Sequence, residues 1–362
     1  MTERSQEKPV WETAWPDEGL EYLGACPICE SQSRSMLHEN LIDNTFFTAP
    51  GKWTMWCCGD CGSGYLDPRP NKETINLAYS NYYTHKTNSG KAYYGSLNFL
   101  RKLRRRLVNG YTNWRFGTQD LPASALGVLV ANILPSMKKK LDREYRYLPE
   151  LPKDRGVLLD VGCGDGSFLK LAQTCGWEVV GIDPDSSAVG NARKHGLVVY
   201  QGTIEYFDGQ TGIFDVITLN HVIEHLHEPI KVLNSCYNLL KPGGLLWMET
   251  PNINSASLKS FGSNWRGLEP PRHLVIFNRQ SLVYAINSVG FSNFTIQSAN
   301  PQSALSLAKA SKAISIGVGV NGNITLSPQE KFEFWVNRAK QAIFTSRNDL
   351  VTISAKKQSE IK

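Results

Sequence analysis

The stretch 157-VLLDVGCGDGSFL-169 decides the fold of this chain. Its first part, Val157–Val161, is a short apolar run that predicts a buried parallel strand. Three glycines follow at alternate positions, Gly162, Gly164 and Gly166, and a helical pattern begins directly after them. Glycines permit a tight turn and let a ligand approach the backbone closely. The stretch therefore predicts a strand, a ligand-binding turn and a helix, which together form the first unit of an α/β fold.

A second predicted strand, residues 177–182, ends at Asp183, which lies 21 residues beyond Gly162. An acidic residue at that place can hydrogen-bond both hydroxyls of a ribose. Two cofactor types use this geometry. A dinucleotide requires a third glycine where Ser167 stands, and Asp160 would repel its pyrophosphate. The same carboxylate would attract the amino group and the sulfonium of S-adenosylmethionine, so we interpret the turn as a site for that cofactor.

Four segments between residues 157 and 252 resemble the successive motifs of class I S-adenosylmethionine-dependent methyltransferases. They are VLLDVGCGDGSFL, VVGIDP, FDVITLNHVIEHL and LLKPGGLLWMETPN. The resemblance is closest to the subgroup of ubiquinone-pathway O-methyltransferases and bacterial glycan-cluster methyltransferases, and it is strong over residues 153–299. It implies a Rossmann-like domain over 153–362, with a seven-stranded, mostly parallel sheet. Its last, antiparallel strand would be Asp349–Lys357, after a helical insertion near 300–348.

The resemblance also implies where the cofactor would lie, at the carboxyl ends of the strands. Residues of the glycine turn would face the methionine part, Asp183 the ribose, and the loop with Thr203 the adenine. Asn220 and His221 would lie under the methionine end. The implied cofactor-binding residues are Asp160, Gly162, Cys163, Gly164, Gly166, Asp183, Thr203, Asn220 and His221.

The candidate catalytic residues follow the fourth strand motif, in 220-NHVIEH-225. If this segment forms one helical turn, His221, Glu224 and His225 share a face through their i, i+3 and i+4 spacing. An imidazole here can remove a proton from a substrate hydroxyl. Alternatively, Glu224 and His225, with His221 or the distant His273, hold Mg²⁺ or another divalent cation. A third interpretation is that these side chains only cap and pack the loop. Related methyltransferases use E-x-x-E-H for a cation, whereas this chain has His221 in place of the first Glu.

The segment 265-WRGLEPPRHL-274 resembles the substrate lid of the glycan-associated branch, within a lid near 252–275. We expect Trp265 to contribute to substrate binding. Arg266, Arg272 and His273 are predicted to meet phosphate or carboxylate groups, which form strong hydrogen bonds with charged donors. The alternative is an ordinary surface loop.

Two Cys-x-x-Cys pairs stand near the start of the chain, Cys26 with Cys29 and Cys58 with Cys61, with 28 residues between the pairs. Four thiolates make a closed tetrahedral Zn²⁺ site with a structural role. We therefore predict a zinc ribbon over residues 1–70, with Cys57 as an alternative to Cys58. These pairs and the segment YSNYYTH (79–85) resemble a zinc-bearing branch linked to surface-polysaccharide biosynthesis.

The net charge of +6 is distributed unevenly. Residues 1–70 carry 5 basic and 11 acidic side chains, whereas residues 71–155 carry 16 and 6. The second segment predicts a basic, aromatic-rich helical connector over 71–152. Its charge has three interpretations: solvated helix faces, a shallow contact with anionic lipid, or attraction to an anionic substrate.

These observations favour O-methylation of a saccharide, a nucleotide sugar or a lipid-linked surface glycan. The alternatives are an RNA methyltransferase, a sugar C-methyltransferase and a non-catalytic cofactor-binding scaffold. A nucleic acid partner is not expected, because Asn220-His221-Val222-Ile223 lacks the N-P-P-aromatic signature of adenine methylation. The first residues lack the apolar region of a secretory signal. We therefore expect a cytoplasmic protein, with peripheral contact to the inner face of the membrane as an option. The oligomeric state is not predicted.

Overall fold

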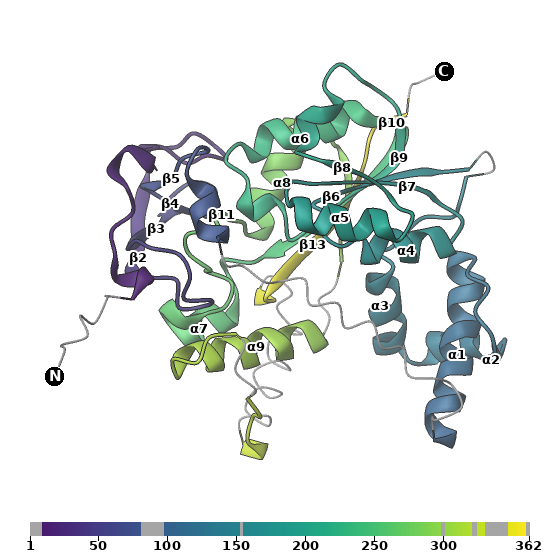
Figure 1. Ribbon diagram of the computed structural model, residues 1–362. Coiled ribbons are helices and arrows are strands. Elements are labelled where there is room, and N and C mark those ends of the chain that lie inside the picture. Colours follow the sequence, from purple (N-terminus) through teal and green to yellow (C-terminus); the bar gives the residue numbers. More distant parts are fainter. Residues whose placement is uncertain are drawn as a thin grey trace.

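The computed structural model describes residues 9–80, 98–152, 155–297, 301–320, 324–329 and 347–359. A twisted sheet with helices on both faces occupies the centre of the molecule (Figure 1). A small β module from the N-terminal part of the chain flanks it on one side. A helical projection formed by α1, α2 and α3 extends on the other side.

The central sheet has seven strands in the order β12-β13-β10-β9-β6-β7-β8. The first five strands of this sheet along the chain are parallel, and β13 runs antiparallel to both β10 and β12. The predicted seven-stranded, mostly parallel sheet is confirmed, and its last strand lies within one residue of the predicted bounds. The strands are β6 (Val157–Val161), β7 (Glu178–Asp183), β8 (Val198–Gln201), β9 (Phe214–Asn220), β10 (Leu240–Pro251), β12 (Asn293–Gln297) and β13 (Leu350–Lys356).

Amphipathic helices cover the sheet because each buries one apolar stripe against it. They begin at identifiable caps. The Asp185 side chain accepts from the Ser187 amide at the start of α5, and Asn278 with Ser281 forms a capping box at α8. These caps satisfy amides that have no partner within the helix. The helices are α4 (Ser167–Thr174), α5 (Ser186–Lys194), α6 (Pro229–Leu239) and α8 (Arg279–Ser288), and the 3₁₀ turns beside them are η5 (Ile204–Phe207) and η6 (Ile223–His225).

The N-terminal module is a four-stranded sheet in the order β11-β4-β3-β2. Three strands come from the N-terminal part of the chain, but β11 (Val275–Ile276) comes from the end of the predicted lid and pairs with β4. The boundary predicted at residue 70 therefore does not separate two independent units. The other elements here are β2 (Arg34–Leu41), β3 (Trp53–Cys58), β4 (Gly64–Leu66), the pair β1 (Leu20–Glu21) and β5 (Arg69–Pro70), and the turns η1 (Val10–Glu12) and η2 (Asp17–Gly19).

The lid segment is folded onto this module. Trp265 and Leu268 of the lid share one buried apolar cluster with Trp15, Trp53 and Met55 of the module. Burial of such large side chains stabilises the contact by roughly 1.5–3 kcal/mol each. The lid contains α7 (Ala256–Phe261) and η7 (Gly262–Asn264), and α9 (Pro301–Ser315) of the predicted insertion packs beside them. Residues 330–346 of that insertion lie outside the described residues.

The basic connector is helical, as predicted, over its described part. It contains η3 (Ile75–Tyr79), α1 (Phe99–Phe116), α2 (Leu126–Ile133) and α3 (Pro135–Glu144). Residues 81–97, which include most of the YSNYYTH segment, lie outside the described residues. In the part of the chain that the structure describes, no helix combines the length and apolar character needed to cross a bilayer.

Candidate functional site

The glycine turn after β6 lies at the carboxyl edge of the sheet. Gly162, Gly164 and Gly166 have φ values of +67°, +54° and +75°, which disfavour other L-residues. A Cβ at Gly162 would stand 2.5 Å from Val222 Cγ2. The Gly164 amide donates to Asp183 Oδ2 over 2.8 Å. Positive φ values and close neighbours therefore restrict this turn to glycine and keep it tight at the carboxyl edge of the sheet.

The two acidic residues predicted for the cofactor have different surroundings. Asp183 also accepts from the Asp185 amide over 2.9 Å, so its carboxylate fixes the glycine turn. Asp160 is completely buried, and Thr218 Oγ1 donates to its Oδ1 over 2.7 Å. Its Oδ2 has no hydrogen-bond partner among the described residues. Burial raises the pKa of Asp160, although the charge of Arg146 opposes this effect.

Arg146 is a site residue that the sequence interpretation missed. It follows α3, has a φ of +48°, and forms an ion pair with Asp160. Its guanidinium also lies 3.7 Å from the ring centroid of Phe168. The carboxylate of Asp160 is therefore already neutralised, whereas the sequence predicts a free negative charge for the cofactor. The sequence places Arg146 only within the basic connector predicted over 71–152, because it does not show that α3 ends over the sheet.

A cavity of about 320 Å³ adjoins Arg146 and the carboxyl ends of β9 and β10. Asn220 lines it, as predicted for the methionine end of the cofactor site. Arg143 binds Glu249 with two hydrogen bonds, one of them 2.7 Å from Nε to Oε2, and both residues line the cavity. Glu249 is held further by Thr352 Oγ1 at 2.7 Å. The cavity thus contains a fixed pair of charges, and through Ser167 it reaches the start of α4, which follows the glycine turn.

The other residues predicted to bind the cofactor do not line this cavity: Asp160, Gly162, Cys163, Gly164, Gly166, Asp183, Thr203 and His221. Cys163 is buried and packs against β7, where a Cβ at Gly181 would come within 2.6 Å of its Sγ. Thr203 Oγ1 donates to Glu205 Oε2 over 2.5 Å in the loop after β8. Their contributions to a cofactor site remain predictions.

In the His/Glu segment 220–225 only Ile223–His225 form a turn, η6, whereas His221 precedes it with a φ of +56°. The side chains of the segment divide into two groups around Glu224. Glu224 is completely buried and accepts from Thr250 Oγ1 over 3.0 Å. His221 Nδ1 lies 3.2 Å from Glu224 Oε1, and the His221 side chain is 40% exposed. Burial would raise the pKa of Glu224, but the hydrogen bond and charge of His221 outweigh it and lower the pKa to about 2. Burial would lower the pKa of His221, but Glu224 outweighs it and raises that pKa.

His225 and His273 lie together on the other side of Glu224. Their ring centroids are 4.8 Å apart, and Tyr79 Oη lies 3.0 Å from His225 Nδ1. One ligand atom each from Glu224, His225 and His273 lies within 4.8 Å of the other two. His221 does not belong to this group, so the predicted face of His221, Glu224 and His225 is only partly formed. Burial lowers the pKa of His273 to about 4, against the opposing charge of Glu269.

The lid residues predicted to bind substrate contact other parts of the protein instead of an open cavity. Arg272 is fully buried and donates to Asp43 Oδ1 and Oδ2 over 3.0 and 2.8 Å. Arg266 forms an ion pair with Glu269. Trp265 is buried in the shared apolar cluster. Sequence cannot show that an acidic residue 229 positions away neutralises Arg272.

The four predicted zinc ligands converge. Cys26 Sγ lies 3.6 Å from Cys61 Sγ, and Cys29 Sγ lies 3.5 Å from Cys58 Sγ. A tetrahedral Zn²⁺ with Zn–S bonds of about 2.3 Å separates its sulfurs by roughly 3.8 Å. The donor set and spacing therefore fit this metal. Cys58 belongs to the four-cysteine group and Cys57 does not.

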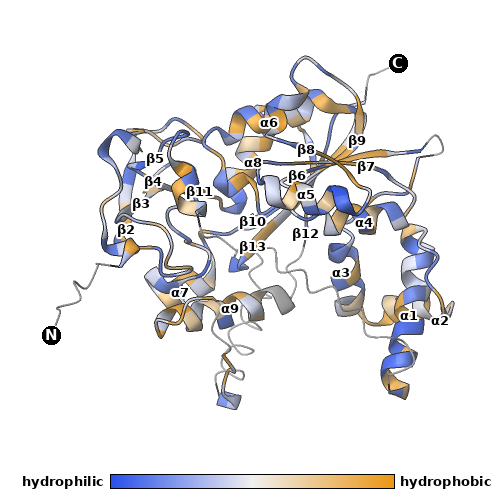
Figure 2. Cartoon of the chain, in the orientation of Figure 1, coloured by the Kyte–Doolittle hydropathy of each residue, from blue (hydrophilic) through white to orange (hydrophobic). Residues whose placement is uncertain are grey.

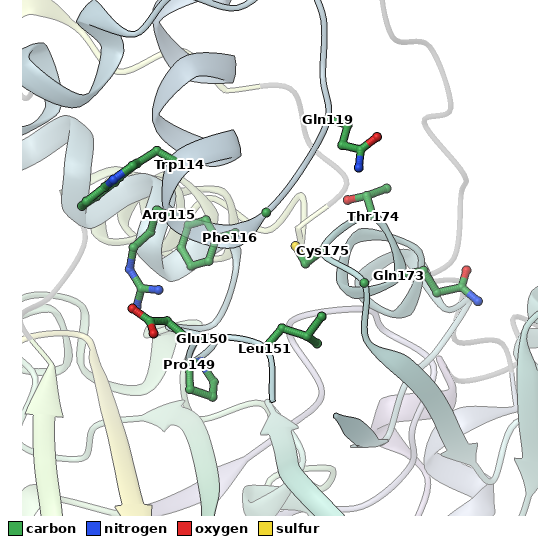
Figure 3. Close-up of a pocket in the computed structure, with 12 residues that line it drawn as sticks. Trp114, Arg115, Phe116, Gln119, Pro149, Glu150, Leu151, Gln173, Thr174 and Cys175 are labelled. Carbon is green, nitrogen blue, oxygen red and sulfur yellow. The ribbon is translucent and has the colours of Figure 1, made fainter. Parts of the chain in front are cut away.

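A further cavity of about 780 Å³ lies at the opposite, amino edge of the sheet (Figure 3). Leu151 lies near the start of β6 and Gly176 near the start of β7, whereas Trp114 and Phe116 come from α1. No residue predicted for catalysis or cofactor binding lines this cavity. The candidate reaction site is therefore at the smaller cavity.

Comparison with known proteins shows that the central domain is similar to methyltransferase domains. Residues 135–296 match the family described as "Methyltransferase domain". The ubiquinone biosynthesis O-methyltransferase of Actinobacillus pleuropneumoniae is 41% identical over 106 residues, which cover 26% of this chain and 45% of that protein. The protein of the same name from Xanthomonas oryzae is 37% identical over 107 residues, which cover 28% and 45%. This chain therefore spans less than half the length of these curated relatives.

Among solved structures, a SAM-dependent methyltransferase from Archaeoglobus fulgidus is 24% identical. The match covers 64% of this chain and 99% of that chain, with a TM-score of 0.42.

Proposed function

We propose, on the premise that residues 135–296 form an S-adenosylmethionine-dependent methyltransferase domain, that this chain transfers a methyl group to a hydroxyl oxygen. The observation that carries the proposal is the position of the glycine turn. It lies at the carboxyl edge of the sheet, where ligands of open α/β folds bind. The cavity lined by Asn220, Arg146 and Glu249 adjoins the turn, because Ser167 at the start of α4 also lines that cavity.

The residues present fit S-adenosylmethionine, which when bound supplies a methyl group already activated on a sulfonium. The positive-φ glycines keep the turn free of side chains. Oδ2 of the buried Asp160 has no partner among the described residues, so an ammonium that reached it would satisfy it, and Arg146, which already pairs with Oδ1, is also a donor suited to a carboxylate. Asp183 would hydrogen-bond the ribose hydroxyls. It also holds the glycine turn, because its carboxylate accepts from the Gly164 amide.

His221 and Glu224 form the pair best placed to accept the proton of the acceptor hydroxyl. The ionised Glu224 orients His221 through the 3.2 Å contact and makes the imidazole more basic. The other ring nitrogen of His221 remains near the cavity wall, with Nε2 3.7 Å from Glu249 Oε1. As the acceptor oxygen gains the methyl group, its O–H bond breaks and the proton passes to the imidazole. Positioning of the acceptor oxygen in line with the methyl group supplies much of the rate.

For the acceptor, we propose a hydroxylated saccharide, nucleotide sugar or lipid-linked glycan. The relatives from Actinobacillus pleuropneumoniae and Xanthomonas oryzae are named O-methyltransferases, which supports oxygen as the methylated atom. The N-terminal module with its four-cysteine group supports the glycan, because it resembles the branch linked to surface polysaccharides. We assign a structural Zn²⁺ to Cys26, Cys29, Cys58 and Cys61, on the convergence of their thiols.

A second arrangement is favoured by the group Glu224, His225 and His273. Two imidazoles and one carboxylate with ligand atoms within 4.8 Å could hold a divalent cation that acidifies the acceptor hydroxyl. This donor set suits zinc or another transition metal better than Mg²⁺, which prefers oxygen ligands. The two arrangements differ in whether His221 or the cation promotes loss of the proton.

The test combines product detection with cofactor binding. The full chain is incubated with methyl-labelled S-adenosylmethionine and a panel of saccharides, nucleotide sugars and phenols, and mass spectrometry detects the added methyl group. We expect His221→Ala to lower turnover by about 10²–10⁴-fold. His195→Ala, at an exposed position after α5, serves as the control and should retain activity.

Two results would separate the alternatives. The cation arrangement would be favoured if a chelator removed activity and Zn²⁺ or Mn²⁺ restored it. In that case His273→Ala should also abolish activity. Tight cofactor binding by calorimetry, without product from any acceptor, would refute the enzymatic proposal in favour of a scaffold.

A further inference from the structure

Helix α2 exposes most of its apolar side chains. Leu126 is 63% exposed and Ile133 is 65% exposed, and Leu129 between them is also exposed. Their spacing of three and four residues places them along one side of the helix. Leu134 extends the exposed set beyond the helix end. Isolated exposed leucines are common on proteins, but a row of this kind marks an interaction site.

Helix α1 adds a second set of exposed apolar side chains. Near its start, Phe99 is 77% exposed, and Leu100 and Leu103 are exposed as well. Trp114, near the other end of the helix, is also exposed. It follows Leu103 by eleven residues, about three helical turns, so these two side chains lie on the same side of α1. The hydropathy colouring shows orange on α2 and at the end of α1 that is farthest from the sheet (Figure 2).

The packing of the two helices keeps these side chains outside. A Cβ at Gly110 would stand 1.8 Å from the Ser124 carbonyl oxygen, and a Cβ at Gly127 would stand 1.9 Å from that of Leu107. The two glycines therefore allow a close contact between the backbones of α1 and the segment 124–127. The contact between the two helices is thus made by backbone and small residues, and Leu126, Leu129 and Ile133 stay exposed.

The same projection is strongly basic. Residues 98–144 contain ten Lys and Arg residues and three acidic residues, Asp120, Asp142 and Glu144. Arg101, Arg104, Arg106 and Lys139 are exposed. A surface that combines a row of exposed leucines with a high positive charge complements an anionic lipid surface, because the bilayer offers both apolar chains and negative headgroups.

We propose that the helical projection, defined as residues 98–144, docks this chain on anionic lipid membranes. Helix α2 has eight residues and is about 12 Å long, too short to span a bilayer. It would lie in the interface with Leu126, Leu129 and Ile133 among the acyl chains and the arginines at the headgroups. Helix α3 also carries Arg143, which lines the candidate reaction cavity, so docking would bring that cavity close to the lipid surface.

The test is flotation of the full chain with vesicles, which requires no enzymatic activity. Vesicles of phosphatidylcholine with about 30% phosphatidylglycerol are compared with pure phosphatidylcholine, at roughly 0.05 M and 0.5 M salt. We expect binding to the anionic vesicles that weakens at high salt. The triple variant Leu126→Gln/Leu129→Gln/Ile133→Gln should reduce the partition coefficient at least about tenfold. The matched control Val198→Gln/Ile316→Gln changes exposed apolar residues elsewhere and should bind normally.

A second variant keeps the test valid if the first one folds poorly. Arg101→Gln/Arg104→Gln/Arg106→Gln changes exposed positions and should also reduce binding about tenfold at low salt. The proposal is overturned if the wild-type chain does not float with anionic vesicles, or if both triple variants float as it does. It is equally overturned if ultracentrifugation shows that the exposed leucines instead join two copies of the chain, with no vesicle binding.

Discussion

Replacing Arg272 by methionine should destabilise the contact between the lid and the N-terminal module. Arg272 and Asp43 both have fully buried side chains, and two hydrogen bonds of 3.0 and 2.8 Å join them. Methionine keeps the apolar volume but leaves the Asp43 carboxylate without its cation. Removing one partner of a buried ion pair costs about 3–5 kcal/mol.

The structure places the expected loss at the lower end of that range, about 3 kcal/mol. The Asp43 carboxylate also accepts from the amides of Phe46, Thr48 and Ala49. These three donors remain in the variant and continue to stabilise the negative charge. For a folded unit of this size, a loss of about 3 kcal/mol lowers the melting temperature by roughly 6–12 °C.

The loss should also depend on pH. Burial raises the pKa of Asp43, but Arg272 outweighs this effect and holds it below the usual value. The pair therefore stabilises the native state fully above about pH 4, and its contribution is lost as pH falls through the native pKa. In Arg272→Met, the pKa of Asp43 should rise, so the acid-induced loss of stability begins at a higher pH.

The assay is urea unfolding followed by tryptophan fluorescence, because Trp265, Trp15 and Trp53 lie in the adjoining cluster. Lys241→Met is the matched control. Its partner Asp215 lies 2.8 Å away, but the two side chains are 40% and 20% exposed, so the expected loss is at most about 1 kcal/mol. If Arg272→Met lowers the free energy of unfolding no more than Lys241→Met does, the reasoning from burial is refuted.

Three further predictions concern the metal, the cofactor turn and acid stability. Metal analysis of Cys26→Ser should show loss of about one equivalent of zinc, whereas Cys57→Ser should keep it; unchanged zinc in both would contradict the assignment. Gly162→Ala should weaken S-adenosylmethionine binding at least about tenfold in calorimetry, because φ is +67° and a side chain stands 2.5 Å from the new Cβ, while Gly190→Ala, with open space around it, should not. Burial raises the pKa of Glu269, but neighbouring cations outweigh it and lower the pKa to about 2. Its contribution to stability should therefore be present above about pH 4.5 and fall toward pH 2, and equal losses in wild type and Glu269→Gln over that range would argue against it.

Local sequence signals predicted the central sheet and identified the four cysteines that converge in the structure. The apolar run 157–161, the glycines after it and Asp183 can be recognised from short stretches of sequence. The structure places them together at one edge of the sheet. The two Cys-x-x-Cys pairs can also be recognised from local sequence, because each short loop holds its own two thiols close together. The choice between Cys57 and Cys58 needed the structure, since only the direction of each side chain from β3 distinguishes them.

The sequence by itself determined the α/β class, the glycine turn and the residues that carry charge. Tertiary structure alone decided which charges are available to a ligand. It turned Arg272 toward Asp43, brought Arg146 onto Asp160, and placed His273 beside His225. The physical reason is that an ion pair depends on distance in space, whereas sequence gives only distance along the chain.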